Sequence, residues 1–173
     1  MSLIKNLSFI VILCGALTIL VFAIILLTRS AGSYRFYYPD KDYKSLKTEQ
    51  RRLDNAQSLK TPKEEKLIRE YFLGPVRYDL EFPLSDKVKI NNIWIINLDG
   101  KMSAVINFNP DFLDFVQSDR ENAKWVLDGL LETLKAGTSI EKLSIYADDK
   151  PLRTKLGNWN LSSPIQLRNK IKK

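Results

Sequence analysis

The stretch Val88–Phe108, VKINNIWIINLDGKMSAVINF, predicts a β-hairpin. Asp99-Gly100 is a strong signal for a two-residue type I′ turn, because both residues tolerate a positive φ. Asn92 interrupts the apolar alternation, so we expect a bulge there, or a tight turn at Asn91-Asn92 that divides the region into three strands. The alternation assigns one face to Val88, Ile90, Trp94, Ile96, Leu98, Met102, Ala104, Ile106 and Phe108.

Amphipathic helices are predicted on either side of this hairpin. Thr61-Pro62-Lys63-Glu64 combines a capping box with a proline at the first helical position, and Gly74-Pro75 ends that helix. Ser118-Asp119-Arg120-Glu121 is a second capping box, and its helix ends at Gly137. The apolar stripes comprise Leu67, Ile68, Tyr71 and Phe72 in the first helix, and Ala123, Val126, Leu127, Leu130, Leu131 and Leu134 in the second.

Two further strands complete the prediction. Tyr34–Tyr38 is aromatic and favours a strand, and Leu143, Ile145 and Ala147 share one face of a final strand over Ile140–Ala147. Residues 41–60 are very polar and are typical of a loop or an exposed strand. We therefore expect an α+β fold, a small two-layer αβ sandwich with two helices on one face of a mixed or antiparallel sheet.

The amino-terminal part of the chain predicts a membrane anchor. Leu7–Thr28 contains 22 residues without a charge, and as a helix it would extend about 33 Å, enough to cross a hydrocarbon core of ~30 Å. A cleaved signal peptide has a shorter apolar region, although cleavage or a buried hydrophobic hairpin stays an alternative. The anchor residues comprise Leu7, Phe9, Leu13, Leu20, Phe22 and Leu27, between a tail of residues 1–6 and a linker of residues 29–33.

Cys14 loosely matches a bacterial lipobox within Val11–Gly15. A lipobox has a small residue before the cysteine, whereas this chain has Leu13, and the apolar run continues past Cys14. We interpret Cys14 as a small apolar residue inside the spanning helix.

Charge alone leaves the membrane topology open. Lys5 precedes the apolar run, and more basic residues follow it, which favours a cytoplasmic domain. Long domains, however, translocate regardless of such charges.

The chain carries a net charge of +7. Residues 153–173 form a basic tail, either simply solvated or attracted to anionic lipid headgroups or an acidic partner. Nucleic acid is not an expected partner, because no element that reads it accompanies the charge. The basic patch comprises Arg153, Lys155, Arg168, Lys170, Lys172 and Lys173.

The composition offers little for catalysis. The absence of histidine excludes histidine-based triads and zinc sites built on imidazole, and a single cysteine excludes an internal disulfide. The sequence contains no phosphate-binding glycine loop and no EF-hand. The acidic pairs Asp111/Asp114, Asp119/Glu121 and Asp148/Asp149 fall at helix starts or in a turn, where structural roles are more common. We expect no catalytic residue, cofactor or metal, and a carboxylate-based hydrolase is the least favoured alternative.

Aromatic and apolar residues predict a candidate interaction surface. Trp125 lies at the edge of a helical stripe, Trp159 lies in a polar segment, and Ile93 and Ile95 have the outward parity of their strand. Each also fits a partly buried packing position. Together they predict a surface for association, because aromatic side chains dominate the energetics of interfaces.

The segment 34–152 resembles the GerMN domain, the sporulation and spore-germination module of many bacterial extracytoplasmic proteins. The resemblance rests on the aromatic strand YRFYYPD, on Leu46, Glu49 and Arg51-Arg52 in the polar stretch, and on Leu73-Gly74-Pro75 at a helix end. Pro83, Asn107-Phe108-Asn109, Phe112-Leu113, Leu131-Glu132-Thr133-Leu134 and Pro151-Leu152 follow in the family's order. The closing turn departs from the family, with Asp148-Asp149-Lys150 where a glycine is usual.

The resemblance implies a non-enzymatic module similar to the ring-building motifs that assemble side by side in secretion and sporulation channels. It implies a single-pass protein of the cytoplasmic membrane, with the amino terminus inside and the domain on the extracytoplasmic side, and it does not imply sporulation itself. The expected partners are the lipid bilayer and either another protein or a second copy of the chain. A domain that binds peptidoglycan or another acidic glycan is the alternative.

Overall fold

The computed structural model describes residues 15, 17–21, 32–53 and 61–168. The chain divides into two compact units, Met1–Ser33 and Tyr34–Lys173. Gly15 and residues 17–21, which include Leu20 of the expected anchor, are helical, and the described part of the chain holds no helix with the length and apolarity that crossing a membrane requires. The remaining anchor residues lie outside the described residues, as does Cys14; these are Leu7, Phe9, Leu13, Phe22 and Leu27.

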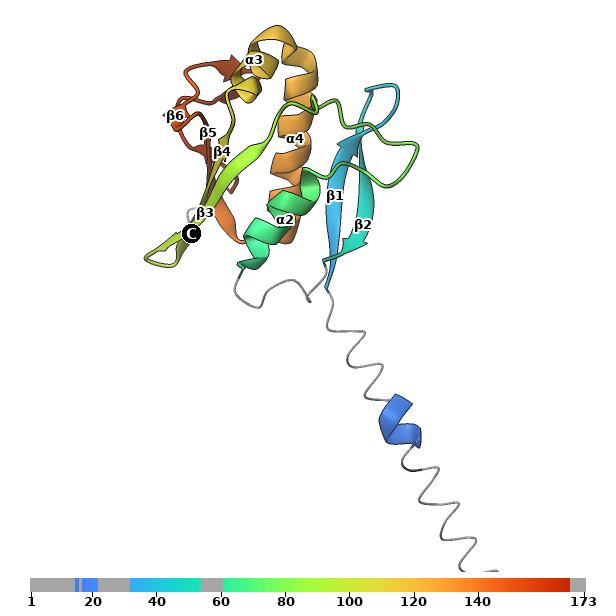
Figure 1. Cartoon of the computed structure of the whole chain (residues 1–173). Coiled ribbons are helices and arrows are strands. Elements are labelled where there is room, and N and C mark those ends of the chain that lie inside the picture. Colours follow the sequence, from blue (N-terminus) through green and yellow to red (C-terminus); the bar gives the residue numbers. More distant parts are fainter. Residues whose placement is uncertain (1–14, 16, 22–31, 54–60, 169–173) are drawn as a thin grey trace, which may run out of the picture. The chain divides into compact units, whose positions relative to one another are not determined.

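The second unit contains three described helices and nine strands (Figure 1). The helices are α2 (Lys63–Tyr71), α3 (Asp111–Ser118) and α4 (Arg120–Gly137). The longer strands are β1 (Ser33–Pro39), β2 (Leu46–Arg52), β3 (Ile90–Leu98), β4 (Lys101–Phe108) and β5 (Ile140–Ala147). The short strands are β6 (Lys150–Pro151), β7 (Lys155–Leu156), β8 (Trp159–Asn160) and β9 (Ile165–Gln166).

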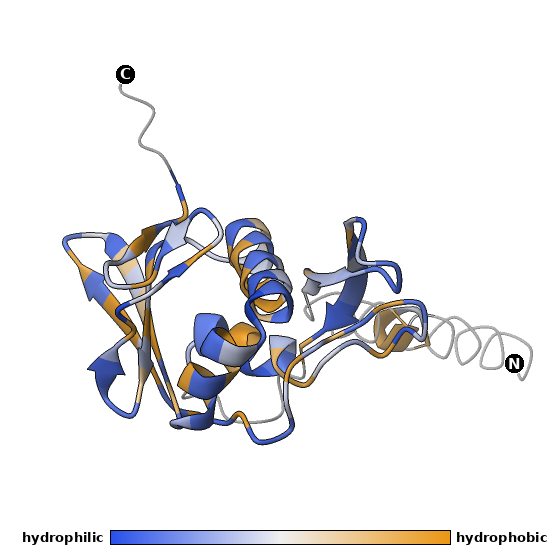
Figure 2. Cartoon of the chain, turned by 90° about the horizontal axis from the view of Figure 1, so that it is seen from above, coloured by the Kyte–Doolittle hydropathy of each residue, from blue (hydrophilic) through white to orange (hydrophobic). Residues whose placement is uncertain are grey.

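These elements form three layers rather than the expected two. The main sheet has the order β3-β4-β5-β6, with β9 also on β5, and α2 and α4 cover one of its faces (Figures 1 and 2). The strands β1 and β2 form a separate sheet on the far side of these helices. The α+β class is confirmed, and the main sheet is mixed because β3 and β4 are antiparallel while β4 and β5 are parallel.

The third layer exists because β1 has its own apolar contacts with the helices. Phe36 and Tyr38 on β1 are fully buried, and the Tyr37 amide donates to Thr133 Oγ1 of α4 at 3.0 Å. Gly129 permits this approach, since a Cβ there would lie 2.4 Å from the Tyr37 carbonyl oxygen. The polar side chains of residues 41–60 had predicted a loop or an exposed strand, and β2 in this stretch is a largely exposed strand that pairs with β1.

The helices follow their predicted stripes, but their starts differ. All six stripe residues of α4 are buried, as are Leu67, Ile68 and Tyr71 of α2. Asp119, not Ser118, caps α4 and accepts the Asn122 amide at 3.3 Å. The N-cap of α2 is Pro62, and no side chain caps that helix. The short helix α3 was not predicted, because its eight residues provide barely two turns of periodicity.

The hairpin is confirmed, but one strand presents the opposite face from the one expected. Asp99 and Gly100 have φ values of 52° and 73°, as a type I′ turn requires. Ile90 pairs with Phe108 and Asn92 with Asn107, so Asn91 is an extra residue in β3. This bulge reverses the alternation beyond it, because strand side chains alternate with a period of two. Ile93 is therefore buried, with 8% exposure, and Trp94, Ile96 and Leu98 face solvent.

The carboxy-terminal segment is folded as far as Leu167, although its charge had suggested a solvated tail. Leu156, Leu161, Ile165 and Leu167 are buried in the same core cluster as the helices. The strand β9 pairs with β5 through Leu143 and Ile165. These four apolar residues, spaced among charged and polar ones, had given a weaker signal than the basic residues around them.

Candidate interaction surface

The acidic pairs have structural partners. Asp119 caps α4, Asp111 accepts from Asn109 Nδ2 at 2.6 Å, and Asp149 accepts from Asn107 Nδ2 at 2.7 Å. In the described part of the chain, no group of three histidine, cysteine, aspartate or glutamate residues is placed to hold a metal ion. These contacts account for the pairs as parts of turns and helix starts.

Of the two predicted tryptophans, Trp125 is part of α4 and Trp159 contacts that helix, and both are partly buried. Trp159 Nε1 donates to Asp128 Oδ1 at 2.7 Å, and Lys124 Nζ forms an ion pair with Asp128 Oδ2, also at 2.7 Å. The Trp125 ring lies 6.2 Å from the Tyr43 ring between β1 and β2. The structure thus does not bring them together with Ile93 and Ile95, which face the core.

The basic patch is only partly free. Arg168 donates to the carbonyl oxygens of Lys135 and Thr138 and fastens the end of the described chain to the end of α4. Arg153 and Lys155 are exposed, and Lys170, Lys172 and Lys173 lie outside the described residues. The patch is therefore not one continuous surface among the residues that the structure describes.

Three large apolar side chains are exposed on the loop after α2, and the sequence analysis did not predict an interaction surface there. Leu73, Val76 and Tyr78 are 76%, 83% and 88% exposed. The sequence had marked Leu73-Gly74-Pro75 only as the end of a helix and as a point of resemblance to a family. The apolar residues around Gly74-Pro75 do not recur with the period of a helix or a strand. No pattern in the sequence therefore distinguished Leu73, Val76 and Tyr78. We refer to residues 73–79 as the exposed loop.

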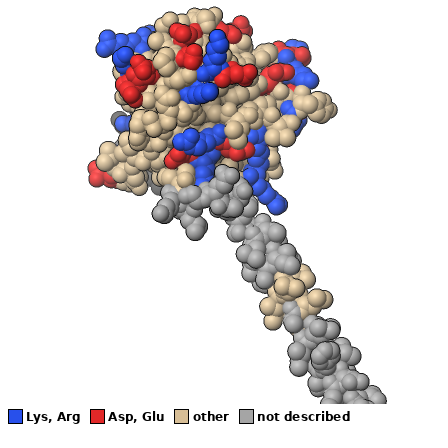
Figure 3. Space-filling model, viewed as in Figure 1, with Lys and Arg blue, Asp and Glu red and all other residues tan. Residues whose placement is uncertain are grey.

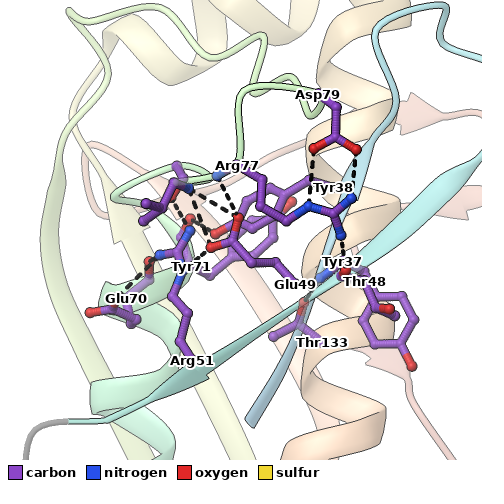
Figure 4. A network of polar contacts seen from close by, with 12 residues as sticks. Tyr37, Tyr38, Thr48, Glu49, Arg51, Glu70, Tyr71, Arg77, Asp79 and Thr133 are labelled. Carbon is purple, nitrogen blue, oxygen red and sulfur yellow. Dashed lines mark hydrogen bonds and ion pairs between the residues drawn. The ribbon is translucent and has the colours of Figure 1, made fainter.

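Two buried charged residues hold the backbone of the exposed loop (Figure 4). The Glu49 carboxylate accepts the amides of Val76 and Arg77 at 3.0 Å and 2.9 Å. Arg51 donates to Glu49, to Glu70 Oε1 at 3.1 Å and to the Gly74 carbonyl oxygen. Glu49 and Arg51 both come from β2, so this strand connects the end of α2 to the loop that follows.

The electrostatics of this network favour the charged forms. Burial alone would raise the pKa of the Glu49 carboxyl, but the Arg77 amide, the Arg51 guanidinium and the Val76 amide together outweigh it and lower that pKa. Burial likewise opposes the charge on Arg51, but its hydrogen bonds to Glu49 and Glu70 and the electrostatic effects of Tyr38 and Glu49 together outweigh burial and raise its pKa. The Arg51 guanidinium also lies 5.2 Å from the Phe36 ring centre and 5.5 Å from that of Tyr38.

The far end of the exposed loop is fastened as well. Arg77 pairs with Asp79 and donates to the Thr48 carbonyl oxygen at 3.0 Å. The Glu81 amide then donates to the Pro39 carbonyl oxygen at 2.9 Å, which joins the chain to the end of β1. The loop therefore presents large apolar side chains from a backbone that is held along its length. Such an arrangement is suited to contact with another molecule, because little ordering remains to be done on binding.

A mixed main sheet, two covering helices and a separate β1–β2 sheet define a small α+β domain. The family model for sporulation and spore germination, named Germane, matches residues 35–153. The chain belongs to the Germane family. The match covers most of the segment that resembles a GerMN domain and confirms that assignment.

Solved structures support the same fold. The first GerMN domain of the sporulation protein GerM from Bacillus subtilis is 14% identical, with a TM-score of 0.50, over 78% of this chain and 94% of that chain. The tandem GerMN domains of the same protein are 18% identical, with a TM-score of 0.53, over 78% of this chain and 45% of that one. This chain thus spans less than half of the tandem structure. No curated protein sequence matches the chain.

Proposed function

We propose that this protein is a membrane-anchored module of the bacterial cell envelope that works by binding another protein rather than by catalysis. Its domain lies on the extracytoplasmic side of the cytoplasmic membrane, and its amino terminus lies in the cytoplasm. Membership of the Germane family supports the envelope role. The uncharged run Leu7–Thr28 supports the anchor, because its length matches the thickness of a hydrocarbon core.

The exposed loop is the observation that carries the binding role. Leu73 and Val76 expose wholly apolar side chains and Tyr78 is 88% exposed, and exposed apolar side chains that gather on a surface commonly mark interaction sites. Burying Glu49 and Arg51 also has a desolvation cost that well-packed apolar residues would avoid. The hydrogen bonds of Glu49 and Arg51 go to the exposed loop and to the helix end before it. The buried pair therefore fixes the conformation of the loop.

The location is tested with a reporter fused after Lys173 that is active only outside the cytoplasm. Activity from the full chain supports the proposed topology. An inactive fusion, together with activity from a reporter that works only inside the cytoplasm, would contradict it.

The binding role is tested by replacing Tyr78 with a photo-crosslinking amino acid in cells that make the full-length protein. We expect a discrete crosslinked protein that disappears when Leu73 and Val76 are both changed to serine. The same replacement at Ser163, an exposed residue away from the exposed loop, serves as the control and gives no such product. If the protein instead co-sediments with isolated peptidoglycan and Tyr78 captures no protein, the glycan-binding alternative replaces this proposal.

A further inference from the structure

The strand β3 forms an edge of the main sheet. It stands at the end of the sheet order and pairs with β4 alone. Within the described residues, the backbone of residues 91–98 has no backbone hydrogen bond to any segment other than β4. The nine residues of β3 include no charge and no proline. Natural proteins usually block such edges with lysine, proline or a covering element, because an open edge pairs readily with another strand.

The outward side of β3 is apolar as well. Trp94, Ile96 and Leu98 are 45%, 39% and 69% exposed, and all three follow the bulge on the solvent side of the sheet. Figure 3 shows the end of the molecule that carries the β3–β4 hairpin as largely uncharged surface. An incoming strand would therefore meet both free backbone groups and a row of large side chains.

The sequence of β3, INNIWIINL, is nearly the same read in either direction from Trp94. If a second β3 lies antiparallel with the two Trp94 residues opposite each other, Ile93 faces Ile95 and Asn92 faces Ile96. The regular register ends at the extra residue Asn91, because Ile90 before it faces the core while Leu98 faces solvent. Antiparallel pairing of like with like favours a second copy of this chain as the occupant of the edge, since cross-strand pairs are the unit of sheet stabilisation.

The charges that flank β3 fit the same register. Lys89 immediately precedes the strand, and Asp99 follows it. In an antiparallel pair centred on Trp94, the bulge brings Lys89 of each copy opposite Leu98 of the other and next to its Asp99, within reach of the long lysine side chain. Neither side chain has an ion-pair partner among the described residues, so both remain available. The register thus places two opposite-charge pairs at the two ends of one neutral, apolar strand pair.

We propose that two copies of this chain associate through their β3 edges, antiparallel and two-fold symmetric about Trp94, to form one sheet that continues across the dimer. This inference names one partner for the proposed binding module and rests on that proposed function. A shared membrane favours the pairing, because anchoring two copies in the same surface raises their effective concentration. Leu73 of the exposed loop lines a pocket with Lys89 and Ile90 at the start of β3, whereas Val76 and Tyr78 do not line that pocket and stay available to a different protein.

Disulfide trapping tests the register directly. The full-length protein is reconstituted in phosphatidylcholine vesicles with Cys14→Ser, which removes the single native thiol, and with Trp94→Cys. Directly opposed residues in an antiparallel pair have Cβ atoms about 4.5–5.5 Å apart, near the separation that a disulfide needs. We expect mild oxidation to give a covalent dimer. Tyr78→Cys, more exposed than Trp94 but on the exposed loop, is the matched control. Equal crosslinking of the two variants, or none with Trp94→Cys, would overturn the proposal.

The flanking charges provide a second test in the same vesicles, read by fluorescence energy transfer between labelled full-length copies. Lys89→Glu places two carboxylates next to each other at each end of the strand pair and should weaken the dimer by about tenfold, given typical energies of exposed charge pairs. Adding Asp99→Asn removes the repulsion and should restore most of the association, because asparagine still suits the type I′ turn. An unchanged Lys89→Glu dimer, or no rescue, contradicts the proposed register. Crosslinking from Tyr78 should persist in Lys89→Glu, so failure of the dimer is distinguishable from failure of the binding role.

Discussion

At the residue scale, the Glu49–Arg51 pair decides how the segment after α2 is held. Glu49 is 4% exposed and accepts two backbone amides, while Arg51 donates to two carboxylates and two carbonyl oxygens. The sequence marked both residues only as points of resemblance to a family. Their partners were not predictable, because Val76, Arg77 and Gly74 lie more than 20 residues away along the chain.

Glu49→Ala should lower the free energy of unfolding by about 3–5 kcal/mol, because it leaves Arg51 buried without its nearest charge. Urea denaturation of the purified full chain, followed by tryptophan fluorescence, measures the change. Glu65→Ala removes a more exposed partner of Arg69 and should change stability by about 0–1 kcal/mol. Equal effects of the two substitutions would show that burial of the pair is unimportant.

The lowered pKa of Glu49 predicts a loss of stability in acid. The carboxyl has an ordinary pKa of 4.5 and a lower one in the folded protein, so the unfolded chain binds a proton first as the pH falls. The stabilisation is fully present above pH 4.5 and is lost as the pH falls through the folded pKa. The pKa values of Asp40 and Asp79 are lowered too, so these groups also make stability depend on pH. The contribution of Glu49 is therefore obtained by comparing the stability of the native chain with that of Glu49→Gln at each pH.

We expect the melting temperatures of the native chain and Glu49→Gln to differ most near neutral pH and to converge as the pH falls below 4.5. Thermal unfolding at intervals between pH 7 and pH 3 measures this. A difference that stays constant over the whole range would mean that ionisation of Glu49 does not contribute.

At the element scale, the close contact between α4 and β1 depends on one missing side chain. Gly129→Ala improves the intrinsic helix propensity by about 1 kcal/mol. It also places a Cβ 2.4 Å from the Tyr37 carbonyl oxygen and 2.6 Å from the Tyr71 hydroxyl. We expect net destabilisation of about 1–3 kcal/mol from overpacking, measured by urea denaturation.

Gly137→Ala is the matched control on the same helix, because its Cβ would meet the flexible end of Leu67 at 2.7 Å rather than a backbone atom. Its effect should be smaller than that of Gly129→Ala. The opposite order would indicate that β1 moves away from α4 easily.

The elements themselves were largely predictable from local pattern. The two long apolar stripes, the Asp99-Gly100 turn and the strand Ile140–Ala147 each depend on periodicity or turn chemistry within a few residues. The face of β3 was not, although the bulge near Asn92 had been expected, because the alternation was continued through it. The site residues were less predictable than the fold, since the exposed loop has no period and is held by residues from β2.

At the scale of the whole molecule, the folded unit extends beyond residue 153, where the family match ends. Leu161 and Leu167 lie in the core cluster with α4 and β5. We expect Leu161→Ala to lower the free energy of unfolding by about 2–5 kcal/mol, as buried leucines do when truncated. Lys155→Ala, at an exposed position in the same segment, is the control and should change it by about 0.5 kcal/mol or less. Similar values for the two would show that this segment contributes little to the fold.

The extra residue in β3 has a consequence for related chains. Without the extra residue Asn91, Trp94 would face the core and Ile93 would face solvent. An insertion or deletion of one residue here would turn every core-facing side chain of β3 after the bulge toward solvent, and every solvent-facing one toward the core. The composition of the strand would stay almost unchanged. In homologues, the number of residues around this bulge therefore indicates how readily the β3 edge associates with another strand better than the hydrophobicity of its residues does.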